Sequence, residues 1–210
     1  MKTPEHPIFL ESVEYIRSQI GKTGLNSVQQ SVLERIIHSS GDLSLQPYLR
    51  FSSKACEVGI SALKNGAIIL TDTYMAAAAV SPVAKRTLNS NVECILKMAP
   101  DLIDSSSVTR SAIGMKKMWL SMKRKKEFSV GPIVLIGSAP SALMTLLDLI
   151  EELKQKPSLI IGMPVGFIGV SECKNRLLRS DCSHIILEGS KGGASIAAAT
   201  VNALLKAADT

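Results

Sequence analysis

The chain has 210 residues and a formal net charge of +6, with 46% hydrophobic and only 4% aromatic residues. This composition is typical of one folded domain with an aliphatic core, and it excludes a disordered chain. No apolar run is long enough to span a membrane, and the N-terminal residues lack the apolar core of a secretion signal, so we expect a cytoplasmic protein.

Residues 7–20 form the first predicted helix, because Ile8, Ser12, Tyr15, Ile16 and Ile20 recur at helical spacing. These residues are expected to make one packing face. Ser12 on this face is either a small packing residue or a hydroxyl that points into a cleft, and spacing alone favours packing.

The second predicted helix starts at Ser27, with Gln30 completing a capping box, and ends at Gly41. His38 therefore lies in its last turn. A histidine there either satisfies the helix end or acts as a proton donor near neutral pH, since an unperturbed imidazole titrates around pH 6.5. Spacing alone favours the capping role.

Short aliphatic runs follow, alternating with helices. Residues 49–51 are a short extended piece. The five predicted strands are 67–71, 92–95, 132–136, 158–161 and 184–187. The remaining predicted helices cover 54–65 (capped by Ser53), a short segment opened by Ser81 and Pro82, 107–125, 140–154, 171–178 and an Ala-rich segment ending at Lys206.

This alternation predicts an α/β fold: a single domain over residues 1–210, with a mostly parallel sheet of about five strands and helices on both faces. Ligand groups gather at the carboxyl ends of such strands. Thr71 and Asp72, at the end of the first of these strands, therefore belong to a candidate site loop.

Two glycine-rich turns follow later strands, one containing Ser138 and the other spanning positions 189–193. Neither has the spacing of a dinucleotide fingerprint or a P-loop, so each is either a tight turn or an anion site at a helix start. Arg110 lies at the start of a helix, where the dipole disfavours a cation. It is equally well explained as a surface ion pair or as a group that binds carboxylates.

A basic cluster follows on the same helix. Its members are Lys116, Lys117, Lys123, Arg124, Lys125 and Lys126. A solvated helix end is the favoured interpretation over a ligand site, and the scarcity of aromatic residues disfavours nucleic acid as a partner.

Cysteine and histidine usage disfavours a metal site. Cys56, Cys94, Cys173 and Cys182 form no Cys-x-x-Cys pair, and the three histidines are scattered. The expectation is four reduced and mostly buried thiols.

Seven motifs in order resemble those of the precorrin-8X methylmutase family of cobalamin biosynthesis, from about Pro7 to Leu205. They include the segments around His38, Arg50, Asp72, Arg110, Ser138, Val165 with Lys174, and Lys191. Ser138 and Ser141 stand where the family usually has Asn and Thr.

The resemblance implies an isomerase that moves a methyl group from C-11 to C-12 of precorrin-8X or cobalt-precorrin-8. The product would be hydrogenobyrinic or cobyrinic acid, with no separate cofactor and no metal site. His38 would be the catalytic residue, and Ser12 and Arg110 would line the substrate site. Thr71 and Asp72 at the strand end, and Ser138 in the glycine-rich turn, are the other residues expected to bind substrate. The family also implies a homodimer with the site near the interface, acting on a corrinoid and not on nucleic acid or membranes.

Two other functions compete with this expectation. A non-catalytic corrinoid carrier would share the fold but would bind precorrin-8X without converting it. A nucleotide-dependent enzyme of doubly wound type rests on fold analogy alone.

Overall fold

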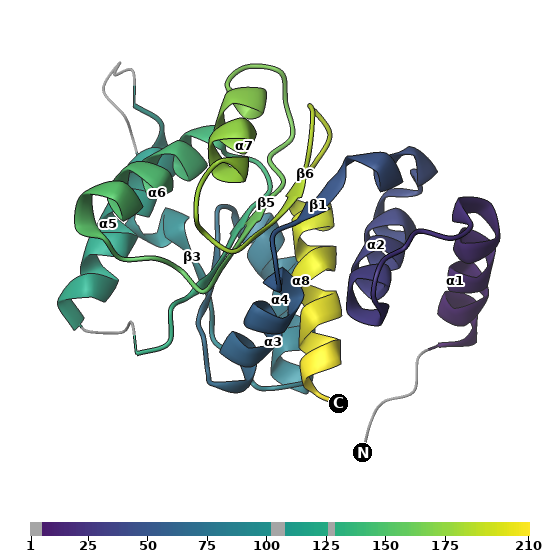
Figure 1. The fold of residues 1–210 in the computed structure, drawn as a ribbon. Coiled ribbons are helices and arrows are strands. Elements are labelled where there is room, and N and C mark those ends of the chain that lie inside the picture. The colour runs from purple at the N-terminus through teal and green to yellow at the C-terminus, as the bar shows by residue number, and fades with distance from the viewer. Residues whose placement is uncertain (1–5, 102–107, 126–128) are drawn as a thin grey trace.

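The computed structural model describes residues 6–101, 108–125 and 129–210. Their core is a six-stranded sheet in the order β1-β6-β5-β4-β2-β3 (Figure 1). The strands are β1 (Leu49–Phe51), β2 (Ile69–Thr71), β3 (Val92–Cys94), β4 (Ile133–Ile136), β5 (Leu159–Gly162) and β6 (His184–Leu187). All neighbours pair in parallel except β1, which runs antiparallel to β6. The five strands expected from the sequence are confirmed, and the extended piece at 49–51 adds a sixth.

Eight α-helices among the described residues surround this sheet. They are α1 (Pro7–Ile20), α2 (Ser27–Ser40), α3 (Ala55–Lys64), α4 (Tyr74–Arg86), α5 (Arg110–Lys125), α6 (Pro140–Leu153), α7 (Val170–Leu178) and α8 (Ala194–Ala208). Two short 3-10 helices, η1 (Leu43–Tyr48) and η2 (Ile95–Met98), complete the elements. No helix in the described part of the chain is both long and apolar enough to cross a membrane.

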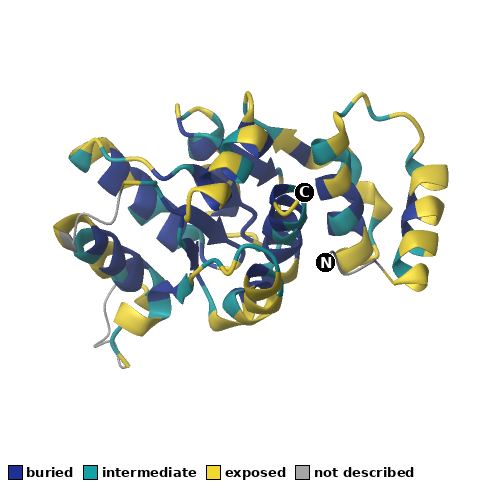
Figure 2. Cartoon of the chain, turned by 90° about the horizontal axis from the view of Figure 1, so that it is seen from below, coloured by how far each residue is buried: buried dark blue, intermediate teal, exposed yellow. Residues whose placement is uncertain are grey.

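The strands are aliphatic on both faces because both faces are covered by helices. Alternate strand residues enter different cores: Leu135 and Ile161 pack with α2, α3, α4 and α8, whereas Val134 and Ile160 pack with α5, α6 and α7. Figure 2 shows the buried residues concentrated in the sheet and on the helix sides that face it. The predicted single α/β architecture is therefore confirmed.

Three helix starts differ from the sequence predictions. Helix α3 begins at Ala55 after Lys54, which forms no side-chain cap, so the predicted Ser53 cap is wrong. The other two starts have a side-chain cap at a different residue from the predicted one. The cap of α2 is Asn26 with Gln29, one residue earlier than the predicted Ser27 pair. Helix α4 begins after Thr73, whose hydroxyl accepts the Ala76 N–H, so Pro82 lies inside the helix instead of opening it. In both cases the short polar side chain directly before the helix satisfies its first N–H groups.

The packing face of α1 also differs from the prediction. Val13 and Ile16 are buried, whereas Ile8 and Tyr15 are exposed. Helix α1 packs against α2 with only part of its surface. An ion pair from Arg17 to the buried Glu34 joins the two helices. One face of α1, which carries Ile8 and Tyr15, is therefore largely exposed.

The cysteine prediction is confirmed, since all four thiols are free and buried. Burial raises the pKa of Cys56 to about 12 and that of Cys173 to about 11, so neither forms thiolate near neutral pH. We expect a thiol reagent such as DTNB at pH 8 to label none of the four cysteines in the native protein and all four after unfolding in urea. Rapid labelling of the native protein would contradict this packing.

Candidate active site at the carboxyl edge of the sheet

The loops that leave the parallel strands surround a cavity of about 480 Å³ at the carboxyl edge of the sheet. Much of its lining is hydroxyl-bearing. The Thr109 and Ser141 hydroxyls are hydrogen-bonded to each other at 2.6 Å, and Ser138 is exposed beside them. The lining residues are Thr109, Ser111, Ser138, Ala139, Pro140, Ser141, Met144, Ile168, Gly169 and Glu172.

Asp72 lies behind one wall of this cavity and holds the turn that forms it. Its Oδ2 accepts three backbone N–H bonds, from Gly137 (3.0 Å), Ser138 (2.6 Å) and Ala139 (2.8 Å). The anion that this glycine-rich turn binds is therefore the protein's own carboxylate. Burial raises the pKa of Asp72, while the three N–H bonds act in the opposite direction.

Thr71 and Asp72 are both fully buried, so their side chains lie behind the cavity surface. The Thr71 hydroxyl donates to the carbonyl of Thr73 at 3.0 Å, which holds the loop that follows β2. In this structure the two residues shape the loops, and direct contact with substrate stays a prediction.

Replacing Asp72 with asparagine should destabilise the fold by about 3 kcal/mol, because the three N–H groups would then donate to a neutral amide and no longer to a carboxylate. It would also place an NH₂ group at the position of Oδ1, which is buried and has no hydrogen-bond partner among the described residues. We expect a fall in melting temperature of roughly 6 to 12 °C for a chain of this size. Calorimetry would measure it, with the exposed Asp209→Asn as the control. An unchanged melting temperature for Asp72→Asn would contradict the anchoring role.

Arg110 is the first residue of α5 and is exposed. The Thr109 hydroxyl accepts the Ala112 N–H and so caps the helix, which places Arg110 next to the cavity lining. Its Nε donates to the carbonyl of Pro100 at 2.8 Å, and its other guanidinium nitrogens form no ion pair within the described chain. The bond orients the guanidinium and leaves a planar fork suited to a carboxylate.

His38 is exposed in the last turn of α2. Gly41 ends this helix in the left-handed conformation (φ 67°), and its N–H donates to the carbonyl of Ile37. The ring of Phe9 in α1 meets the imidazole edge-on, with the ring centroids 5.0 Å apart. Helix α2 is anchored by one buried apolar face, which includes Ile36 and Ile37, and it presents the imidazole to solvent.

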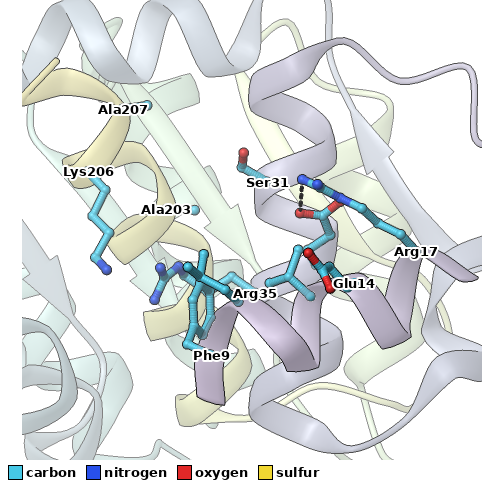
Figure 3. Close-up of a pocket in the computed structure, with 11 residues that line it drawn as sticks. Phe9, Glu14, Arg17, Ser31, Arg35, Ala203, Lys206 and Ala207 are labelled. Atoms are coloured by element: carbon cyan, nitrogen blue, oxygen red, sulfur yellow. Dashed lines mark hydrogen bonds and ion pairs between the residues drawn. The ribbon is translucent and has the colours of Figure 1, made fainter. Parts of the chain in front are cut away.

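Ser12 is half-buried, and its hydroxyl donates to the carbonyl of Ile8 at 2.9 Å. Below it, α1, α2 and α8 enclose a second cavity of about 410 Å³ (Figure 3). The Arg35 guanidinium lies over the Phe9 ring there, 4.5 Å from its centroid. Phe9 therefore connects this cavity with His38 and fixes the N-terminal end of α1.

The sequence-predicted site residues fall into two groups within one chain. Ser12 and His38 lie on α1 and α2, whose core residues pack beside α8, whereas Ser138 and Arg110 lie with α5 and α6. Figure 1 shows these helix pairs at opposite sides of the molecule. The described residues contain no cluster of three or more side chains able to hold a metal ion.

The basic cluster of α5 is a solvated helix face over the part that the structure describes. Lys116, Lys117, Lys123 and Arg124 are exposed, while Met115 and Trp119 make the buried face of the same helix. The side chain of Lys125 and residue 126 lie outside the described residues.

Sequence reasoning gave no role to a buried lysine in this region. Lys174 of α7 is only 1% exposed and lies on the same helix face as Val170, Cys173 and Leu177. A lysine within an apolar stripe was the signal that could have identified it.

Comparisons with known proteins match nearly the whole chain. A family model described as precorrin-8X methylmutase matches residues 7–207. A cobalt-precorrin-8 methylmutase from Synechocystis sp. is 35% identical over 96% of this chain and 95% of its own. A precorrin-8X methylmutase from Pseudomonas aeruginosa is 36% identical over 94% and 93%.

A solved structure, a precorrin-8X methylmutase from Thermus thermophilus, superposes with a TM-score of 0.84 at 31% identity, covering 97% of this chain and 98% of that one. The family match and the structural match both extend over nearly all of the described fold, including both groups of site residues. The chain therefore belongs to the precorrin-8X methylmutase family.

Proposed function

We propose that this chain is an isomerase of cobalamin biosynthesis, which moves the methyl group of precorrin-8X or its cobalt complex from C-11 to C-12. The observation that carries the proposal is the family match over residues 7–207, which includes the exposed His38 segment. The reaction breaks one carbon–carbon bond and forms another within the same molecule. It therefore needs a fixed ring geometry and a correctly placed proton, and no net oxidant or reductant.

His38 is the proposed proton donor. The imidazole protonates a ring nitrogen of the macrocycle, which favours the rearranged conjugation, and recovers the proton when the product forms. Its exposure and its place at the rigid end of α2 support this role.

The remaining site residues hold the substrate in this proposal. Arg110 pairs with a peripheral carboxylate of the corrinoid, and the Ser138 hydroxyl donates a hydrogen bond. The Ser12 oxygen, whose proton is bonded to the Ile8 carbonyl, accepts one. Thr71 and Asp72 contribute by fixing the loops at the cavity wall. Ser138 is shorter than the asparagine that the family usually has at this position, so its reach toward the ligand is shorter.

A homodimer is the assembly that brings the two groups of residues together. Each site would combine His38 and Ser12 of one protomer with Arg110 and Ser138 of its partner. Exposed apolar side chains support this arrangement, because the outer face of α1 carries Ile8 and Tyr15 and the loop before α7 carries Phe167 and Ile168. Burying such groups between two copies would stabilise the assembly. Sedimentation equilibrium should give twice the monomer mass.

The proposed partner is a corrinoid small molecule, without nucleic acid, and the proposed compartment is the cytoplasm. Four free cysteines support a reducing compartment.

Mixing the purified protein with precorrin-8X, and separately with its cobalt complex, tests the proposal. The visible spectrum should change to that of the conjugated product with no nucleotide or metal added. A spectrum that reports binding without conversion would overturn the enzyme and favour the carrier.

A further inference from the structure

Lys174 is buried without an acidic partner. Its Nζ donates to two backbone carbonyls, those of Gly189 and Lys191, each at 2.8 Å. The ion pairs of the described residues do not include it, and burial lowers its pKa to about 8. An amine is costly to bury, so its position needs a structural reason. The two carbonyls belong to one loop, residues 188–193, which links β6 to α8.

This loop is held closely by its neighbours as well. The Gly193 N–H donates to the carbonyl of Met163 at 2.9 Å, and Ser190 accepts the Gly166 N–H at 3.0 Å. A Cβ built on Gly192 would lie 2.1 Å from the Met163 oxygen, which leaves room only for glycine. The loop is therefore packed against the loop that follows β5, and Lys174 fixes it from inside the protein.

The outer side of the loop reaches the segment that carries His38. The Lys191 ammonium contacts Asp42 Oδ2 and Ser44 Oγ, each at 2.6 Å. The Lys191 bond, together with a bond from the Ser44 hydroxyl to Asp42 Oδ1, lowers the pKa of Asp42 to about 2, so the carboxylate stays charged at neutral pH. Asp42 directly follows Gly41, and its N–H donates to the Ser40 hydroxyl at the end of α2.

We propose that Lys174 is a positioning residue for the methylmutase reaction, acting through Lys191 and Asp42 on the end of α2 that presents His38. The inference rests on the proposed function of His38. The buried ammonium sets the carbonyls of residues 189 and 191, which sets the direction of the Lys191 side chain. Lys191 then ties the turn after His38 to the edge of the sheet.

The two backbone carbonyls that Lys174 contacts explain why an amine is present at position 174. Two carbonyls converge on one point, so a single group with at least two N–H donors satisfies both. Methionine has a similar stem and no donor, and would leave two buried carbonyls without partners. The expected result is a loosened loop in a protein that still folds.

The test compares Lys174→Met, Lys191→Met and the double variant with Arg176→Met as the matched control. Arg176 lies on the same helix but pairs with Asp148 and Glu151 of α6, away from the loop. Two measurements are made: amide hydrogen exchange over segments 188–193 and 36–44, and kcat and KM with precorrin-8X.

Lys174→Met should speed exchange in both segments and lower kcat about tenfold, with KM changed less, because two buried hydrogen bonds are lost. Lys191→Met should speed exchange in 36–44 and lower kcat similarly. The double variant should lose no more kcat than the worse single variant, since both act through one path. Arg176→Met should change neither segment. Should Lys174→Met not fold, Lys174→Gln takes its place: its amide nitrogen ends one atom short of the Nζ position, so it should show the same changes to a smaller extent.

Normal exchange over 36–44 together with normal kcat in either the Lys174 or the Lys191 variant would overturn the proposal, as would additive losses of kcat in the double variant. The exchange data need no substrate. A wild-type protein that fails to convert precorrin-8X, while Lys174→Met still loosens both segments, would refute the proposed reaction and leave the connection to α2 standing.

Discussion

His38→Asn should slow conversion of precorrin-8X by about a hundred- to ten-thousand-fold, the usual loss when a general acid is removed. Asparagine keeps a hydrogen-bonding group of similar reach but supplies no proton near neutral pH. Product binding should stay nearly unchanged, since the proposed substrate contacts of Arg110 and Ser138 are elsewhere. The imidazole is exposed, so the free energy of unfolding should change by less than about 0.5 kcal/mol.

His6→Asn is the matched control for this variant. His6 is also exposed, and its Nδ1 accepts the Ile8 N–H as the cap of α1. Asparagine can fill the same capping role. Single-turnover kinetics and a product titration on both variants separate catalysis from binding. Normal turnover with a lowered melting temperature in His38→Asn would show a helix-end role in place of the acid.

Two inactive variants should restore activity when they are combined. If each site takes His38 from one protomer and Arg110 from the other, a heterodimer of His38→Ala and Arg110→Ala has one intact site and one doubly altered site. Random assortment makes half of the dimers heterodimers, so the mixture should recover about a quarter of the wild-type activity. Each variant alone should be nearly inactive.

Coexpression of the two variants with different affinity tags isolates the heterodimer for this measurement. The control is coexpression of two copies of His38→Ala, which contains no intact site in any combination. Activity of the tagged heterodimer no higher than the sum of the parent variants would place His38 and Arg110 in the same protomer's site, or in separate sites.

The sheet was readable from sequence because strands covered on both faces are continuous aliphatic runs, as at 133–136 and 159–161. The antiparallel direction of β1 could not be predicted, because a run of three residues does not indicate which strand it pairs with or in which direction. The start of α4 was predicted wrongly because Pro82 is a stronger sequence signal for a helix start than Thr73. In the structure Thr73 caps the helix and Pro82 lies inside it. Local sequence patterns predict which residues are buried. The direction of a strand and the choice of helix cap depend on residues that are distant in the sequence.

The site was predictable in part. The position of His38 before Gly41 follows from helix and cap patterns, and the structure places it there. The three N–H bonds to Asp72 join residues more than 60 positions apart, and spacing along the chain does not indicate them. The exposed face of α1 was misjudged because apolar residues at helical spacing look alike whether they pack within a chain or remain exposed on its surface.

The central claim is an intramolecular methyl migration, and a labelling measurement tests it most directly. Precorrin-8X carrying ¹³C in the C-11 methyl group and a second isotope label in the ring is mixed with an excess of unlabelled substrate and converted by the protein. Carbon NMR of the product should show the ¹³C as a methyl group on C-12, and mass spectrometry should show only doubly labelled and unlabelled molecules, with none carrying a single label. A label that remains on C-11, or that passes between molecules, would contradict the proposed isomerase.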